Sequence, residues 1–450
     1  MKRLLALILT ASALLLALMS CGRITHTLNI IGDCEGFRVT AVTGKSVSLE
    51  EAVASSGPRA KEFDLLLIGT DGLVARISGN DLSGCILVYS KEYAWELRSE
   101  GHPPSANIKN LANIVVTSTS EDIHATRFIN AEKTQSLTAG QLLLRASRVL
   151  NEEGTSSLDG RNVTVYTTQW RISFAEMLPK GKSFCAVGID GKALYFSDTK
   201  DCFLVFDKTQ ISLILPDGRE IKGLAGVMAN PPRLTITQTT ADALRFLEQG
   251  ERVMIILLDG WGYSMQRRAG NKWAPFLHSL EPERALACYP PISPVGLASM
   301  LTGKTPDVHG ITDRENREML SEDLFTAAAK MSTSSAYIEG SRTLINTSLA
   351  PVLSLSDAEV FKNAMKALEN KPDLIFVHFH EIDDAGHQYG PYAAQTLQKI
   401  WETDSYVREL AKAFDSRLII TADHGMRELL DGGAHGQFFS EDMLVPYAVR

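Results

Sequence analysis

Apolar and polar residues alternate in two different ways along the chain, and the change falls near Pro231 and Pro232. In the C-terminal part, short apolar runs alternate with segments in which apolar residues recur every three or four positions. The runs predict buried strands at 252–258, 334–338, 373–379 and 417–421, and the other segments predict helices at 240–249, 322–331, 356–369 and 393–413. This alternation is typical of an α/β fold with a doubly wound, mostly parallel sheet between two layers of helices.

The N-terminal part has short apolar runs separated by Gly, Asp and Ser turns, which predict strands near 64–69, 85–89, 113–117 and 203–206. Three short motifs occur twice in the same order and at similar spacing. They are Ser48-Leu-Glu-Glu51 with Ser173-Phe-Ala-Glu176, Ile68-Gly-Thr-Asp-Gly72 with Val187-Gly-Ile-Asp-Gly191, and Ile108-Lys-Asn-Leu-Ala112 with Ile221-Lys-Gly-Leu-Ala225. This repeat predicts two related β-rich units, residues 22–130 and 131–235, before an α/β domain at 240–450.

Composition sets broad limits on the class of protein. The chain has 450 residues, of which 44% are hydrophobic and 22% charged, so we expect a globular protein of several domains. Its formal net charge is −8, whereas a general nucleic-acid surface would be basic. We therefore expect no nucleic-acid-binding surface, and an anionic substrate would have to be held locally.

The first 21 residues have the pattern of a bacterial lipoprotein signal peptide. Lys2 and Arg3 precede an apolar stretch at 4–18, and Leu18-Met-Ser-Cys21 resembles a lipobox. The prediction is a chain lipidated at Cys21 and held by its lipid anchor on the extracytoplasmic side of a cell membrane; a plain signal peptide or an uncleaved anchor is the alternative. The other five cysteines form no CxxC pair, and we expect buried free thiols.

Several potential metal ligands follow the predicted strands of the C-terminal part. In doubly wound sheets the carboxyl ends of the strands meet at one edge, so these side chains are expected to converge. Three carboxylates, three imidazoles and one hydroxyl are the groups that two Zn²⁺ ions sharing a nucleophile require, and other divalent metals are possible. The seven candidate metal ligands are Asp259, Ser293, Asp383, His387, Asp423, His424 and His435.

Ser293 has two compatible interpretations. Because Pro294 follows it, Ser293 is expected to cap a helix over Val295–Thr302 that ends at Gly303. A helix N-terminus also concentrates backbone N–H groups where an anionic ester would bind. Ser293 is therefore both a predicted cap and a predicted nucleophile.

These motifs resemble the alkaline phosphatase superfamily, and within it the type I phosphodiesterase/nucleotide pyrophosphatase group. The resemblance is carried by Asp259-Gly, Ser293-Pro with Leu301-Thr-Gly303, Glu381-Ile-Asp-Asp-Ala-Gly-His387, Asp423-His-Gly-Met426 and His435-Gly. It implies that Asp383, His387 and His435 hold one zinc ion. It also implies that Asp259, Asp423 and His424 hold the other, with Ser293 between them.

Two departures from that group concern the substrate. The group usually has a threonine nucleophile followed by an aromatic residue, Pro and Asn, whereas this chain has Ser293-Pro-Val-Gly296. Arg314 stands where an asparagine that contacts the phosphoryl oxygen is expected, which makes Arg314 a further catalytic candidate. Serine and arginine are closer to phosphomonoesterases of the wider superfamily, so monoesters and diesters both stay open.

We expect a metal-dependent hydrolase of phosphate esters that forms a phosphoseryl intermediate. An envelope phosphotransferase with the same first half-reaction is an alternative, as is a non-catalytic binding lipoprotein with a structural metal pair. The N-terminal units each resemble the molybdopterin-binding fold of sulfite-oxidase-like enzymes. Because no molybdenum-ligating cysteine with its motif is found there, a structural or binding module without redox chemistry is expected.

Overall fold

A computed structural model describes residues 25–130, 134–159, 161–177 and 180–450. It contains two compact units that interleave along the chain. Unit 1 has residues 25–125, 137–172 and 205–211, and unit 2 has residues 126–136, 173–204 and 212–450. In the part described, no helix is both long and apolar enough to cross a bilayer. Cys21 lies outside the described residues, and the predicted domain boundaries stay predictions.

Unit 1 is built on a five-stranded sheet in the order β2-β1-β8-β4-β5. Its strands are β1 (Thr25–Gly32), β2 (Phe37–Val42), β4 (Phe63–Gly69), β5 (Val74–Ser78) and β8 (Leu111–Ser118). A three-stranded sheet adds β3 (Ser46–Ser48), β6 (Ile86–Ser90) and β7 (Ala94–Arg98). The helices of this unit are α2 (Leu49–Ser55), η1 (Pro104–Ala106) and α3 (Ala139–Leu143). The strands predicted at 64–69, 85–89 and 113–117 correspond to β4, β6 and β8.

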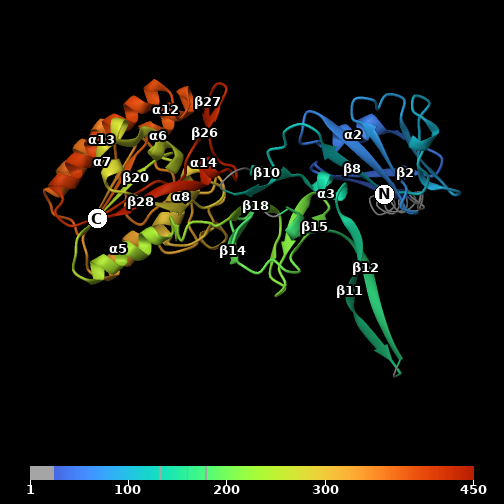
Figure 1. Ribbon diagram of the computed structural model, residues 1–450, viewed down its shortest axis with the longest axis horizontal. Coiled ribbons are helices and arrows are strands. Elements are labelled where there is room, and N and C mark those ends of the chain that lie inside the picture. The colour runs from blue at the N-terminus through green and yellow to red at the C-terminus, as the bar shows by residue number, and fades with distance from the viewer. Residues whose placement is uncertain (1–24, 131–133, 160, 178–179) are drawn as a thin grey trace, which may run out of the picture. The chain divides into compact units, whose positions relative to one another are not determined.

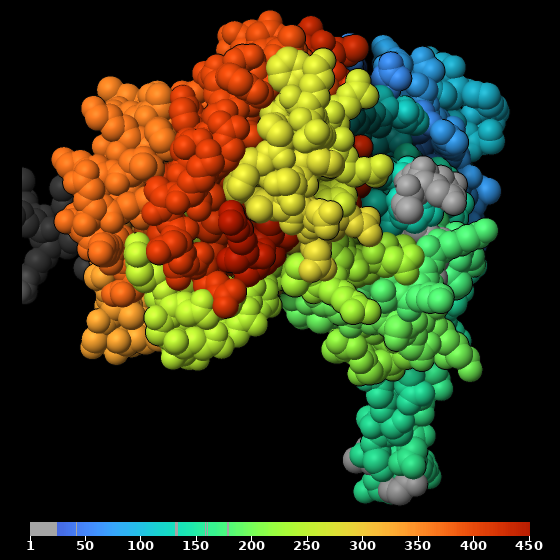
Figure 2. Space-filling view, turned by 60° about the vertical axis from the view of Figure 1, so that its left-hand side comes forward, coloured from blue at the N-terminus to red at the C-terminus, as the bar shows by residue number. Residues whose placement is uncertain are grey.

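A long hairpin pairs β11 (Ser147–Leu158) with β12 (Arg161–Ser173) in antiparallel register. Figure 2 shows it as a narrow arm in teal green. Side chains on both of its faces are exposed, including Leu150 at 68% and Val163 at 60%. The hairpin forms one side of a five-stranded sheet that continues with β15 (Phe203–Asp207), β16 (Gln210–Ile214) and β17 (Glu220–Ile221), in the order β11-β12-β15-β16-β17.

Unit 2 contains another five-stranded sheet, in the order β10-β9-β18-β13-β14. Its strands are β9 (Thr126–Ile129), β10 (Thr134–Leu137), β13 (Phe184–Gly188), β14 (Ala193–Phe196) and β18 (Leu224–Ala229). In this sheet and in the sheet around β8, the middle strand is parallel to one neighbour and antiparallel to the other: β8 to β1 and β4, and β18 to β9 and β13. Shorter elements are α4 (Phe174–Met177), β15 (Phe203–Asp207), β16 (Gln210–Ile214) and β17 (Glu220–Ile221).

The repeated Asp-Gly motifs form two similar turns. Asp71 Oδ1 accepts a hydrogen bond from the backbone N–H of Leu73 at 3.0 Å, and Asp190 Oδ1 accepts one from that of Lys192 at 3.1 Å. The first turn connects β4 to β5 and the second connects β13 to β14. These turns account for the repeated motif locally, while the division into two related units stays a prediction.

The C-terminal part of unit 2 is a mixed α/β structure around an eight-stranded sheet, in the order β19-β21-β28-β25-β20-β24-β22-β23. Only β28 runs against the others, since it is antiparallel to β21 and β25. The mostly parallel sheet agrees with the prediction, although the apolar pattern did not indicate the edge strands. The strands are β19 (Leu234–Thr235), β20 (Val253–Leu258), β21 (Glu283–Leu286), β22 (Ser335–Glu339), β23 (Val352–Leu353), β24 (Leu374–Phe379), β25 (Arg417–Thr421) and β28 (Leu444–Val449).

Helices cover both faces of this sheet, as α5 and α13 show in Figure 1. One face carries α5 (Gln238–Glu248), α8 (Ser293–Thr302) and α10 (Leu324–Lys330). The other carries α6 (Tyr263–Trp273), α7 (Pro275–Ser279), α11 (Asp357–Leu368), α12 (Glu381–Tyr389) and α13 (Ala394–Ala413). Shorter elements are α9 (Pro306–His309), α14 (Ser440–Met443) and the hairpin of β26 (Arg427–Leu429) and β27 (Gly432–Ala434).

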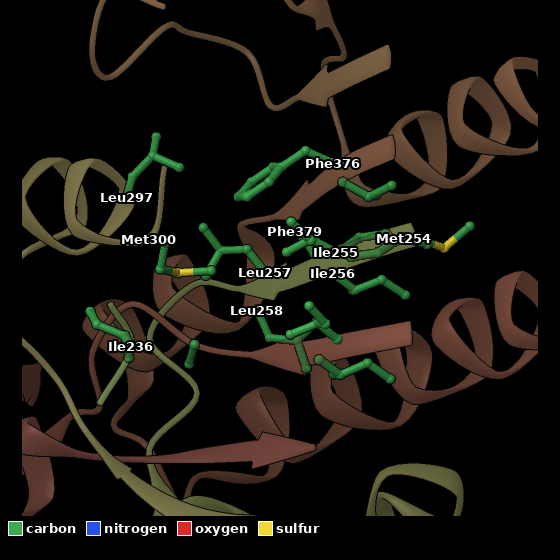
Figure 3. Close-up of a cluster of buried hydrophobic side chains, with 14 of the residues drawn as sticks. Ile236, Met254, Ile255, Ile256, Leu257, Leu258, Leu297, Met300, Phe376 and Phe379 are labelled. Atoms are coloured by element: carbon green, nitrogen blue, oxygen red, sulfur yellow. The ribbon is translucent and has the colours of Figure 1, made fainter. Parts of the chain in front are cut away.

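The core explains why the central strands read as continuous apolar runs. All six residues of β20 and of β24 are buried, because helices cover both faces of these strands. Figure 3 shows Leu257 of β20 facing Met300 of α8, with Phe376 and Phe379 of β24 alongside. The core thereby fixes the ends of β20 and β24, from which several candidate site residues extend.

The described cysteines are buried free thiols, as predicted, and none of them is bonded to another: Cys34, Cys85, Cys185, Cys202 and Cys288.

Candidate active site

The candidate residues come together at the carboxyl edge of the eight-stranded sheet. Asp259 follows β20 directly, and Asp423 comes two residues after β25. Asp383 lies in the first turn of α12, which begins two residues after β24. Parallel strands bring these segments to one edge, as the sequence predicted.

Ser293 lies at the start of α8 with its hydroxyl directed at two of the predicted ligands. Its Oγ is 3.3 Å from Asp259 Oδ1 and 3.2 Å from His424 Nε2. The predicted capping role is wrong, because the helix begins at Ser293 itself, its cap residue is Ile292, and the serine side chain makes no capping bond. The hydroxyl is therefore directed into the site at the N-terminus of a buried helix.

Asp259, Asp423 and His424 form one potential ligand group. His424 Nε2 lies 3.4 Å from Asp259 Oδ1 and 3.4 Å from Asp423 Oδ2. Ligand atoms about 2.0 Å from a tetrahedral ion lie about 3.3 Å apart, so these separations suit a shared divalent cation. All three side chains are buried.

Asp383, His387 and His435 form a second group. His387 Nε2 lies 3.0 Å from His435 Nε2 and 3.4 Å from Asp383 Oδ2. Asp383 and His387 are four residues apart on α12, which places them on one face of that helix. The two groups adjoin, because the rings of His424 and His435 stack with centroids 3.7 Å apart.

Each of the three imidazoles presents Nε2 to the site for the same reason. The Nδ1 atoms of His387, His424 and His435 lie 3.1, 3.0 and 2.8 Å from the backbone oxygens of Gly433, Gly425 and Pro291. A carbonyl oxygen only accepts, so each Nδ1 carries the proton and each neutral ring keeps a lone pair on Nε2. Metal-binding histidines are commonly oriented in this way.

The charge balance of the site also fits cations. Asp383 Oδ1 and Asp423 Oδ2 are buried without a hydrogen-bond partner in the described structure. Burial, followed by the neighbouring Asp259 carboxylate, raises the pKa of Asp423 to about 7. Burial and the neighbouring His424 lower the pKa of His435 to about 2, which keeps this imidazole neutral. Unpaired carboxylate oxygens beside imidazoles that turn Nε2 toward them fit the metal ions that the motifs imply.

Two glycines let the backbone come this close. Gly260 has a φ of +71°, and a Cβ there would lie 2.7 Å from Asp383 Oδ1. At Gly296, a Cβ would lie 2.5 Å from the Cβ of Asp423. Any side chain at either position would displace a candidate ligand.

Arg314 reaches the rim of the second group. Its Nη2 lies 3.4 Å from His435 Nε2. Among the described residues no ion pair joins it to Asp313 or Glu315, and Asp313 instead accepts from the backbone N–H groups of Glu315 and Asn316. The exposed guanidinium is thus next to the site.

Sequence reasoning missed Glu339, the last residue of β22, and did not include His378 and His380 among the candidate ligands. His378 Nε2 and His380 Nδ1 lie 3.4 and 3.2 Å from Asp259 Oδ2. Both imidazoles thus contact Oδ2 of Asp259, whereas Ser293 contacts Oδ1. The available signal was a glutamate that ends an apolar strand. His309, the last residue of α9, is buried with its Nε2 2.9 Å from Ser299 Oγ.

Comparison with known proteins identifies the C-terminal part. Residues 253–350 and 340–446 match the family model described as type I phosphodiesterase / nucleotide pyrophosphatase. The predicted resemblance is confirmed for these residues. Every candidate site residue lies within them.

The similar proteins cover a smaller part of the chain than the family model does. GPI ethanolamine phosphate transferase 1 of Neurospora crassa is 33% identical over 101 residues, which are 21% of this chain and 10% of the relative. The protein of the same name from Emericella nidulans is 28% identical over 104 residues, or 20% and 11%. The match thus spans about a tenth of each relative.

Two solved structures share the likeness at low identity. Phosphonoacetate hydrolase from Sinorhizobium meliloti 1021 aligns with a TM-score of 0.33 and 18% identity, over 48% of this chain and 60% of that one. Murine ectonucleotide pyrophosphatase / phosphodiesterase 5 aligns with a TM-score of 0.33 and 17% identity, over 39% and 58%.

Proposed function

We propose that the chain is a metal-dependent enzyme of phosphoryl transfer that hydrolyses phosphate esters with Ser293 as nucleophile. The observation that carries the proposal is the placement of the Ser293 hydroxyl within 3.3 Å of both Asp259 and His424, between two groups of potential ligands. The family match over residues 253–446 supports phosphodiesterase-type chemistry. Zn²⁺ is the proposed metal, because carboxylate and imidazole ligands in groups of three suit it.

Each part of the site has a distinct role in the proposed phosphoryl transfer. Two bound cations would favour ionisation of the serine hydroxyl and withdraw charge from the phosphoryl oxygens. Ser293 Oγ, having lost its proton to solvent, attacks phosphorus and displaces the alcohol of the ester. The N-terminus of α8 favours the anion beside it, and Arg314 holds non-bridging oxygens. Water then cleaves the phosphoserine, which releases phosphate or a phosphomonoester.

A phosphotransferase is the second candidate, and a specific observation favours it. The relatives identified as GPI ethanolamine phosphate transferase 1 share up to 33% identity with a segment of this chain. The first half-reaction would be the same, and an acceptor alcohol would replace water in the second. A lipid headgroup or an envelope polymer could supply that alcohol.

The test is turnover by the purified chain loaded with zinc. A nitrophenyl phosphate monoester and a nitrophenyl phosphate diester would be tested as substrates. Each would be supplied with and without an added alcohol such as ethanolamine. Nitrophenol release with free phosphate or a phosphomonoester as the other product supports the hydrolase. Phosphorylated alcohol as the main product supports the transferase, and no nitrophenol release under any condition contradicts both.

We expect Arg314→Ala to slow monoester hydrolysis more than diester hydrolysis. A guanidinium can hold two non-bridging oxygens of a phosphate group. A diester has one fewer non-bridging oxygen than a monoester and carries less negative charge. The loss for monoesters should be roughly 2–4 kcal/mol of transition-state stabilisation, measured as kcat/KM. Arg317→Ala is the matched control, since its exposed guanidinium instead bonds the backbone oxygen of Thr343. Equal losses on both ester classes would show that Arg314 does not discriminate between them.

The proposed location is the extracytoplasmic face of a membrane, held by lipid on Cys21. Acyl chains on one residue hold a protein strongly at the membrane, since each buried CH₂ contributes about 0.8 kcal/mol to membrane binding. We therefore expect Cys21→Ala to move the protein from the membrane pellet to the soluble fraction. Mass spectrometry of the mature N-terminus is the direct measurement, and an unmodified terminus at another residue would contradict the proposal.

A further inference from the structure

Asp259 belongs to a cluster of four buried or half-buried ionisable side chains, and the proposed reaction does not use the other three. The four are Asp259, Glu339, His378 and His380, delivered by the ends of β20, β22 and β24. The side chains of Glu339 and His378 are fully buried, and that of His380 is 20% exposed. The two buried carboxylates of this cluster can be balanced either by protons on both imidazoles or by a bound cation.

Glu339 fixes the orientation of both imidazoles. His378 Nδ1 is 2.9 Å from Glu339 Oε1, and His380 Nε2 is 2.5 Å from the same oxygen. Further donors to Glu339 are the Tyr337 hydroxyl and the backbone N–H of Gly340. Because an ionised carboxylate only accepts hydrogen bonds, each ring donates one N–H to Glu339. The other nitrogen of each ring then points away from Glu339.

Those other nitrogens converge on one point. His378 Nε2 and His380 Nδ1 lie 3.4 and 3.2 Å from Asp259 Oδ2, and all three atoms lie within 4.8 Å of one another. His378 Nε2 is buried and has no hydrogen-bond partner of suitable geometry in the described structure. The separations match the roughly 3.3 Å expected between ligands of a tetrahedral ion at about 2.0 Å.

We propose that Asp259 Oδ2, His378 Nε2 and His380 Nδ1 bind a third divalent cation, distinct from the two proposed at Ser293. Two imidazoles and one carboxylate suit Zn²⁺ or a similar transition metal better than Mg²⁺ or Ca²⁺, which prefer oxygen ligands. Glu339 is the carboxylate that orients the histidine ligands, a common arrangement in zinc sites. Asp259 would bridge, with Oδ1 facing Ser293 and Oδ2 facing the third cation.

An entry route is present on the far side from Ser293. His380 lines a polar surface cavity of about 280 Å³, together with Gly340, Ser354, Asp357 and Asp384. A hydrated ion could reach His380 through this cavity without passing the nucleophile. The third cation would neutralise the buried carboxylates and hold Asp259 in place.

The test counts metal ions in the full chain and does not depend on turnover. The protein would be saturated with zinc, dialysed, and analysed by mass spectrometry of the metal. We expect three ions per chain in the wild type, two in His380→Gln, and three in His278→Gln, which changes an exposed histidine of α7. A wild type that saturates at two ions, or a folded His380→Gln protein with the same count as wild type, overturns the proposal. Saturation of the wild type at two ions would mean that two protonated imidazoles balance the negative charge of Asp259 and Glu339.

A second variant covers the case in which His380→Gln does not fold. Glu339→Gln keeps all three ligands but weakens the orientation of the rings, so one ion should bind about 10–100-fold more weakly in competition with a chelator. Unchanged affinity for every ion would also overturn the proposal. Because the expected total rests on the proposed function, Ser293→Ala separates the two failures. It should abolish turnover and still bind three ions.

Discussion

Ser293→Ala should lose at least about 10³-fold in kcat for ester hydrolysis while it keeps its metal content, because a covalent nucleophile is removed and the ligands are left. Its Oγ is the only hydroxyl that the described structure places within 3.3 Å of both Asp259 and His424. The measurements are steady-state kinetics and metal content of the purified protein. Ser279→Ala, at an exposed position of α7, is the matched control.

Acid quenching provides a second readout for the same residue. With a slowly hydrolysed ester, phosphate should be trapped on Ser293 in the wild type and be missing from the alanine variant. A loss of only a few fold, or trapped phosphate on another residue, would exclude Ser293 as nucleophile.

His424→Ala should reduce turnover to background and remove at least one bound ion, while the chain stays folded. Its Nε2 lies 3.2 Å from Ser293 Oγ and 3.4 Å from both Asp259 and Asp423. It therefore contacts the nucleophile and also belongs to one ligand group. Truncation removes one of the three ligands of that group, which lowers its metal affinity. Asp383→Ala should behave in the same way through the second group.

The measurements are metal content, turnover and thermal unfolding of the same preparations. His278→Ala controls for the loss of an imidazole away from the site. Full activity in His424→Ala would exclude the proposed site altogether. A chain that unfolds would be replaced by His424→Asn, which keeps a polar group of similar volume.

Much of the C-terminal fold could be predicted from local pattern. The runs ending at Leu258, Phe379 and Thr421 are buried on both sides, so their apolar character is continuous and easily recognised. Strand β28 escaped prediction because it is antiparallel to both of its neighbours and so lies outside the alternation of parallel strands and helices.

The site was predictable where each residue carries its own local signal. Asp259 and Asp423 end apolar strands, and His435 lies in a glycine-rich loop. The contacts of Glu339 with His378 and His380 bridge 39 and 41 residues, so only the order of strands in the sheet reveals them. The capping role of Ser293 was wrong because its hydroxyl faces Asp259 and His424 instead of the backbone of α8.

The carbonyl contacts of the imidazoles have a consequence for how the site loosens. His435 is tied to Pro291, two residues before the nucleophile, and His387 is tied to Gly433, two residues before His435. The nucleophile loop, the glycine-rich loop and α12 are thus linked in series by hydrogen bonds through their own backbone. Local unfolding of any one of them breaks the next link, so the three segments should exchange their amide hydrogens as one cooperative unit.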